Sequence, residues 1–128
     1  MKKEDVKKDV TERIKTFEDA QRETGRLDVP DFSNIPEDLR SYFEAQYKAI
    51  VITEALNEGS KMDWSNGSQK KWLPWFYMSS SGFAFYAAIY GYSYASAGDA
   101  SRLCFKSSEL ATYAGRQFTD IYSSLLLK

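Results

Sequence analysis

The side chains best suited to binding are aromatic and basic residues in the back half of the chain: Lys71, Trp75, Tyr77, Tyr86, Arg102 and Lys106. Aromatic side chains and arginine are enriched at the centres of protein interfaces. Rings can also stack on unpaired bases while neighbouring cations contact phosphates. Alternatively, such residues simply cover a small domain, with lysine stems lying over the rings. Three interpretations of these residues are therefore possible: a protein contact surface, a platform for single-stranded nucleic acid, or a layer that only covers the domain.

Side chains that commonly carry catalysis are scarce. The sequence contains no histidine, which removes the commonest general base and the commonest transition-metal ligand. Cys104 is the only cysteine, so neither an intrachain disulfide nor a cysteine zinc cluster can form. Asp28, Asp31 and Asp63 have the chemistry to bind Mg²⁺, but turn and capping roles suit isolated carboxylates better. We expect no catalytic residue, metal or cofactor.

The charge of the chain is small overall but unevenly distributed. Residues 1–69 contain 11 Lys and Arg against 15 Asp and Glu, a net charge of −4, whereas the whole chain has −1. Residues 70–128 therefore carry +3. Because the total is close to zero, the chain as a whole does not attract nucleic acid or anionic lipid. Any nucleic-acid binding is expected to be weak and sensitive to salt.

Hydropathy predicts a cytoplasmic protein without a membrane partner. The first residues are charged and lack the apolar run of a signal peptide. The longest apolar run, Phe83 to Tyr90, is too short to cross a bilayer as a helix.

The chain is expected to form one domain over residues 14–128, preceded by a charged N-terminal arm at residues 1–13. Val6, Val10, Ile14 and Phe17 have helical spacing, so a helix in residues 2–15 and a loose arm are both open. Thr16 and Asp19 resemble a capping box that would start a helix from Phe17 to Thr24, with Gly25 as its stop.

A longer central helix is predicted to start at Pro36 and to reach Asn57 or Glu58, before Gly59. Its run of apolar residues from Ala49 to Ile52 indicates a buried turn. Helical spacing also predicts one face made of Leu39, Phe43, Tyr47, Ile50 and Glu54.

Three strands are predicted next, from Lys71 to Met78, from Phe83 to Tyr90 and from Arg102 to Phe105. Pro74 makes the first of them an edge strand or a bulged strand. Strict alternation puts Trp72, Phe76, Phe83, Phe85, Ile89, Leu103 and Phe105 on one face. The other face receives the candidate binding residues together with Leu73, Tyr90 and Cys104. A bulge would exchange part of this assignment, because a slip of one residue reverses the faces.

A closing helix is predicted after the third strand. Ser107 or Ser108 caps it, and its apolar stripe runs through Leu110, Ala114, Phe118 or Gln117, Ile121 and Leu125. Gly115 costs about 1 kcal/mol relative to alanine inside a helix, which indicates that a neighbour approaches closely there. The expected fold class is α+β, with the helices covering one face of a three-stranded antiparallel meander.

The tail of the chain carries a specific motif: Arg102 to Ser107, then Glu109 to Ala111, Tyr113 to Gly115, Gln117, Phe118 and Tyr122. This motif resembles the C-terminal signature of a family of small uncharacterised proteins from phages and prophages of gut bacteria. Residues 16–20, 54–59, 63–64 and 74–76 fit the same pattern, whereas residues 1–13 and the stretch from Tyr86 to Ala97 depart from it. The resemblance implies a phage or mobile-element context, hence the host cell cytoplasm, and no activity.

The sequence is compatible with two functions besides an enzyme, which is the least favoured class. The leading hypothesis is a non-enzymatic module that binds a protein partner or a second copy of itself. The alternative is a weak binder of single-stranded nucleic acid that uses the aromatic and basic face of the sheet.

Overall fold

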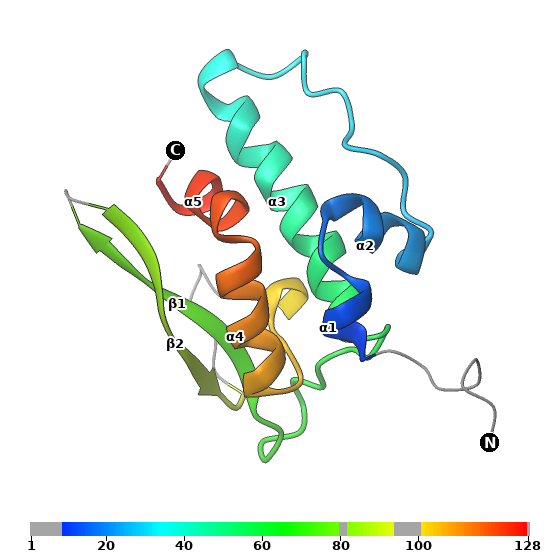
Figure 1. Ribbon diagram of the computed structural model, residues 1–128, viewed down its shortest axis with the longest axis vertical. Helices are drawn as coiled ribbons and strands as arrows, with labels where there is room; N and C mark the ends of the chain where they lie inside the picture. Colours follow the sequence, from blue (N-terminus) through cyan, green and yellow to red (C-terminus); the bar gives the residue numbers. More distant parts are fainter. Residues whose placement is uncertain (1–8, 80–81, 94–100, 128) are drawn as a thin grey trace.

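The computed structural model describes residues 9–79, 82–93 and 101–127. A layer of helices lies on one side of a two-stranded antiparallel sheet, which confirms the α+β class (Figure 1). In chain order the elements are α1 (Val10–Arg13), α2 (Phe17–Thr24), α3 (Glu37–Leu56), β1 (Lys71–Ser79), β2 (Gly82–Gly91), the 3-10 helix η2 (Ser101–Leu103), α4 (Ser108–Gln117) and α5 (Thr119–Leu127).

The predicted capping box at the start of α2 is confirmed. The Thr16 hydroxyl accepts from the Asp19 amide at 3.0 Å, and the Asp19 carboxylate accepts from the Thr16 amide at 3.2 Å. Gly25 ends the helix in the left-handed conformation, at φ 74°. Upstream, residues 10–13 form the single turn α1 within the segment expected to be an arm, and both Val10 and Ile14 are buried.

Helix α3 is the central helix, as predicted, and it contacts α2 and α5. Its Ala49, Val51 and Ile52 are buried. The face predicted to carry Leu39, Phe43, Tyr47, Ile50 and Glu54 is open to solvent in its first half, where Leu39 is 43% exposed and Phe43 is 39% exposed. The reason is that the first turns of α3 extend beyond the neighbouring helices (Figure 1). Small residues further along, Ala45, Ala49 and Ala55, let the other helices pack closely.

The predicted third strand does not form. Residues 101–103 are the 3-10 helix η2, and only Phe105 makes an isolated bridge with Trp72, in which each amide donates to the other residue's carbonyl at 2.9 and 2.7 Å. Pro74 explains why this pairing stops. The backbone amide and carbonyl of successive residues point alternately to the two edges of a strand. After Trp72, the next residue whose backbone points toward the segment of Phe105 is therefore Pro74, and proline has no amide hydrogen to donate.

The predicted closing helix is divided into α4 and α5 at Phe118. The Ser107 hydroxyl caps α4 by accepting from the Leu110 amide at 3.2 Å, which decides between the two predicted caps. At the break, the Thr119 hydroxyl donates to the carbonyls of Gly115 and Arg116 at 2.9 and 3.0 Å. Such a side chain competes with the backbone amides for helix carbonyls, which favours a bend.

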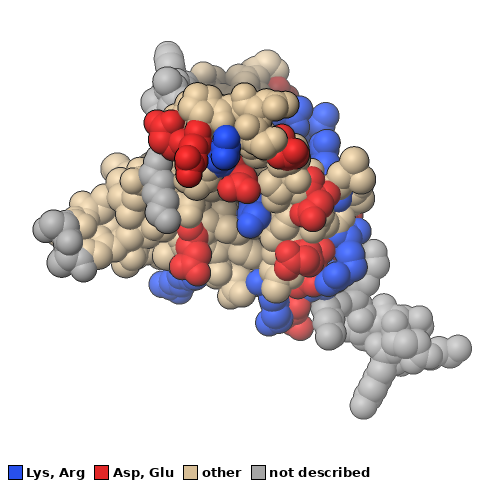
Figure 2. Space-filling model, turned by 90° about the horizontal axis from the view of Figure 1, so that it is seen from above, with Lys and Arg blue, Asp and Glu red and all other residues tan. Residues whose placement is uncertain are grey.

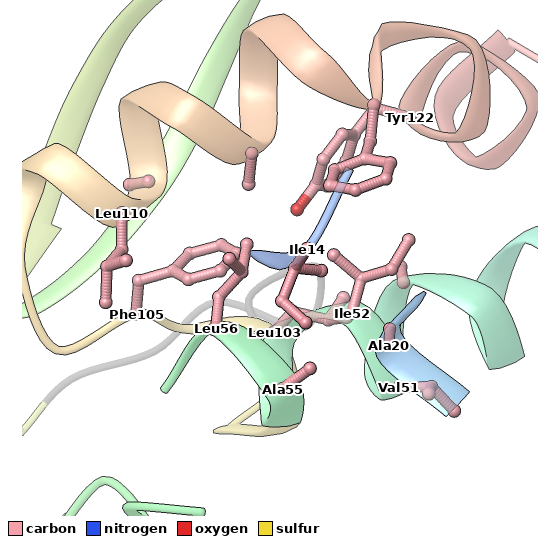
Figure 3. Close-up of a cluster of buried hydrophobic side chains, with 14 of the residues drawn as sticks. Ile14, Ala20, Val51, Ile52, Ala55, Leu56, Leu103, Phe105, Leu110 and Tyr122 are labelled. Atoms are coloured by element: carbon pink, nitrogen blue, oxygen red, sulfur yellow. The ribbon is translucent and has the colours of Figure 1, made fainter. Parts of the chain in front are cut away.

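The main core lies where α3, α4, α5 and the segment from Leu103 to Phe105 meet (Figure 3). Ala111 and Ala114 of α4 are fully buried there, so their small side chains bring that helix close to its neighbours. The side chain of Asn57, next to the end of α3, fixes the same segment: its amide donates to the Cys104 carbonyl at 2.9 Å and its oxygen accepts from the Lys106 amide at 3.0 Å.

Candidate interaction surface

A β-bulge at Tyr86 determines which side chains share a face of the sheet. Trp75 is opposite Ala87 and Phe76 is opposite Phe85, so Tyr86 has no partner on β1. The predicted position for a bulge was Pro74 on the other strand. Because of the extra residue, the alternation predicted for β2 holds on only one side of the bulge.

Between the bulge and the hairpin end, Phe83 and Phe85 face the helices as predicted. The Phe85 ring packs on Gly115, and the Phe76 ring lies 5.0 Å from the Tyr122 ring, measured between centroids. On the other side of the bulge, the predicted face is wrong for Ile89, which is opposite Leu73, and for Tyr90, which is opposite Trp72.

Five large side chains of the hairpin are between 47% and 67% exposed, and we name them the aromatic ribbon: Trp75, Tyr77, Met78, Tyr86 and Tyr90. The hairpin projects past the helices (Figure 1), and this projecting end shows no charged side chain on the face visible in Figure 2. The sequence agrees, since it contains no Lys, Arg, Asp or Glu from Trp72 to Gly98. Lysine, arginine and acidic side chains gather instead over the helices (Figure 2).

The predicted cations do not join the aromatic ribbon. Lys71 is 1% exposed, its ammonium donates to the Asn66 carbonyl at 2.9 Å, and it lies 5.2 Å from the centroid of the Trp64 ring. Lys106 is exposed in the segment before α4, with its Nζ 3.6 Å from Glu58 Oε1. The structure therefore brings together Trp75, Tyr77 and Tyr86 and places the basic members of the candidate set elsewhere.

Arg102 is exposed on η2 and lines a separate cavity beside the end of α3, together with Glu54, Lys61 and Trp64. The Glu54 carboxylate accepts from Arg26 Nε at 2.9 Å and from Arg26 Nη2 at 2.8 Å. These bonds hold the pKa of Glu54 below its ordinary value, with smaller contributions from the charges of Arg102 and Lys61. The cavity is thus a mixed-charge site away from the hairpin.

The predicted carboxylates have local roles. The Asp63 carboxylate accepts from the Ser65 hydroxyl and amide, and the Asp31 carboxylate accepts from the Ser33 amide at 2.9 Å. These hydrogen bonds lower the pKa of both carboxyl groups. Within the described residues, no group of three or more His, Cys, Asp or Glu side chains is arranged to hold a metal ion. Cys104 is buried.

Sequence reasoning missed an apolar groove between β1 and α5. It is lined by Leu73, Pro74, Trp75, Phe76, Met78, Ile89, Leu103, Tyr122, Leu125 and Leu126. Exposed Met78 and Leu126 continue the apolar surface of the aromatic ribbon onto α5. The uncharged stretch after Lys71 was a visible signal for the hairpin part, but no local pattern indicates which strand α5 lies against.

Comparison with models of protein families, with curated proteins and with solved structures found no match. Among the described helices, none has the length and apolar character needed to cross a membrane.

Proposed function

We propose that this chain is a non-enzymatic protein-interaction module whose contact surface is the aromatic ribbon. The observation that carries the proposal is the concentration of Trp75, Tyr77, Met78, Tyr86 and Tyr90, all exposed, on one projecting hairpin whose sequence is uncharged from Trp72 onward. Large apolar patches are uncommon on monomeric proteins and mark interaction sites. Tyrosine, tryptophan and methionine are also the residue types that interface centres favour.

The nucleic-acid alternative has less support than protein binding. A stacking platform needs cations beside the rings to contact the phosphates. Of the candidate cations, Lys71 is buried, and Arg102 and Lys106 lie outside the hairpin, on η2 and in the segment before α4. One exposed lysine, Lys70, does lie beside the aromatic ribbon, with its Nζ 4.7 Å from the centroid of the Tyr90 ring, but a single cation contacts few phosphates. A phage or mobile-element context and a cytoplasmic location stay predictions from the sequence.

The proposal is tested by placing a photoreactive phenylalanine analogue at position 77 of the purified chain and, as a control, at position 27. Leu27 is the most exposed large apolar side chain among the described residues, and it lies in the connector between α2 and α3. Irradiation is expected to give crosslinks from position 77, to a second copy or to another protein in a host extract, and none from position 27. Sedimentation of the unmodified chain at several concentrations reports self-association.

Trp75→Ala is expected to reduce the crosslinking from position 77 and leave the far-ultraviolet circular dichroism unchanged, since the side chain is 56% exposed. A strictly monomeric chain that gives equal, background-level crosslinking from both positions contradicts the proposal.

A further inference from the structure

Within residues 9–79, 82–93 and 101–127, no strand is paired with the outer edge of β2. β1 is hydrogen-bonded to the other edge, and no described backbone group outside the sheet bonds to residues 82–91. Natural proteins protect long edge strands with charged residues, proline or a covering element. The ten residues of β2 include no charge and no proline, so only the bulge at Tyr86 interrupts the edge.

The backbone groups that point outward follow from the hydrogen bonds of Trp72. Its amide and carbonyl both bond Phe105, so they point away from β2, and alternation along β1 then makes Pro74, Phe76 and Met78 point the same way. Their partners on β2 lie in non-hydrogen-bonded pairs. The outward residues of β2 are therefore Tyr90, Ala88, Phe85 and Phe83.

This outward set matches itself when a second β2 strand is placed antiparallel to the first. A two-fold axis between Tyr86 and Ala87 sets Phe83 opposite Tyr90 of the second copy and Phe85 opposite Ala88. Each outward residue then meets an outward residue. The bulge determines where this axis lies: because Tyr86 and Ala87 are successive residues that do not point outward, the axis passes between them rather than through one residue.

We propose that two copies of this chain pair through the outer edges of β2, forming a continuous four-stranded antiparallel sheet; this inference rests on the proposed interaction function and specifies its partner. A second copy fits better than an unrelated segment for two reasons. The edge is self-complementary about the two-fold axis, as isologous dimers require. The hairpin also brings no like charges together, since the sequence is uncharged from Trp72 to Gly98.

The test compares Tyr86→Lys with Tyr77→Lys in sedimentation-equilibrium measurements of the full chain. The two tyrosines are 67% and 63% exposed, so they are matched in type and exposure, but only Tyr86 lies at the proposed axis. Two lysines facing each other there are expected to weaken dimerisation by about tenfold or more, because like charges at an interface cost several kcal/mol. Tyr77→Lys is expected to change it much less.

Crosslinking through introduced cysteines tests the geometry directly. Tyr86→Cys is expected to form a disulfide-linked dimer under mild oxidation, because the two Cα atoms beside the axis fall within the roughly 4–7 Å that a disulfide spans. Position 77 lies on β1, three strand spacings from the β1 of the second copy, so the two positions are at least about 14 Å apart. Tyr77→Cys is therefore expected to stay unlinked. Native Cys104 is buried and serves as the internal control.

Tyr86→Phe keeps the ring and is expected to dimerise like the original chain, which separates a loss of pairing from a loss of folding. The proposed pairing is overturned if the chain is monomeric, or if Tyr77→Lys weakens the dimer as much as Tyr86→Lys. In both cases the interaction function survives if position 77 still crosslinks to a protein. A monomer without such crosslinks removes both proposals.

Discussion

The ring of Phe85 occupies the space that a Cβ atom on Gly115 would fill, and Pro74 Cβ lies 2.9 Å from the same point. Strand and helix are therefore in contact through the backbone of α4. Phe85 and Pro74 are thus the close neighbours that the glycine inside the predicted helix indicated.

Gly115→Ala is expected to destabilise the protein by about 1–3 kcal/mol, the usual cost of overpacking, although alanine favours a helix. Chemical denaturation measures the effect. Gly82→Ala is the control, because no atom lies within 4 Å of its added Cβ. If the clash with Phe85 is the cause, Gly115→Ala should cost less in a Phe85→Ala background, as a double-mutant cycle would show. Equal costs in both backgrounds would argue against it.

Asn57 is expected to be the most sensitive polar residue of the fold. It is buried and uses both ends of its side-chain amide to hold the Cys104 carbonyl and the Lys106 amide. Asn57→Leu leaves both backbone groups without their hydrogen-bond partner, and each group that stays buried without a partner costs about 1–3 kcal/mol of stability. The thermal midpoint should fall strongly, whereas Asn34→Leu, at an exposed position in the connector, should leave it nearly unchanged.

Tyr122 and Tyr113 are expected to respond oppositely to loss of the hydroxyl. The Tyr122 hydroxyl is buried and makes no hydrogen bond of ordinary length and angle. Burial raises its pKa, and the nearby Thr53 hydroxyl opposes this shift only in part. Tyr122→Phe is therefore expected to be neutral or stabilising. The Tyr113 hydroxyl donates to the Ile14 carbonyl, so Tyr113→Phe should cost about 1 kcal/mol. Urea denaturation of the two variants checks this, and a clear loss of stability in Tyr122→Phe would show that its hydroxyl has a partner.

The ion pair between Arg26 and Glu54 predicts a pH dependence of stability. Hydrogen bonds from Arg26 lower the pKa of Glu54 below its ordinary 4.5 in the folded protein. A depressed pKa stabilises the fold above the unfolded-state pKa, and this contribution is lost as the pH falls through the folded value. Because the pair is partly exposed, Glu54→Gln should cost only about 0.5 kcal/mol at neutral pH.

The measurement is the unfolding free energy between neutral pH and pH values below 4.5, for the original chain and Glu54→Gln. The difference between the two should shrink on acidification. Glu44→Gln, an exposed position on the same helix, should follow the original chain at every pH. A constant difference for Glu54→Gln would mean that its charge is not the cause.

The elements with local signals were predictable from the sequence. The capping box of Thr16 and Asp19, the Gly25 stop and the serine cap of α4 depend on hydrogen bonds within a few residues, so they appear in the sequence directly. The two hairpin strands followed from their composition within about one residue. Burial of Ala49, Val51 and Ile52 followed from a turn that is apolar on nearly every side.

The pairing of distant segments was decided by the tertiary structure. The sequence pattern of a strand does not reveal which other strand it will pair with. For this reason the stretch from Arg102 to Phe105 was predicted as a full strand, whereas it forms a single bridge with Trp72 on the edge of β1 that Pro74 interrupts. The bulge at Tyr86 leaves no mark in composition, yet it moves Ile89 and Tyr90 to the opposite faces.

The exposure of the candidate binding residues was likewise predictable only in part from the sequence. The sequence by itself determined that aromatic residues cluster on an uncharged hairpin, because that is a property of neighbouring residues. Only the tertiary structure decided that Lys71 is covered by the loop carrying Trp64 and Asn66, and that Arg102 turns to a cavity beside α3. Burial depends on which remote segment packs against a residue, and periodicity carries no information about that segment.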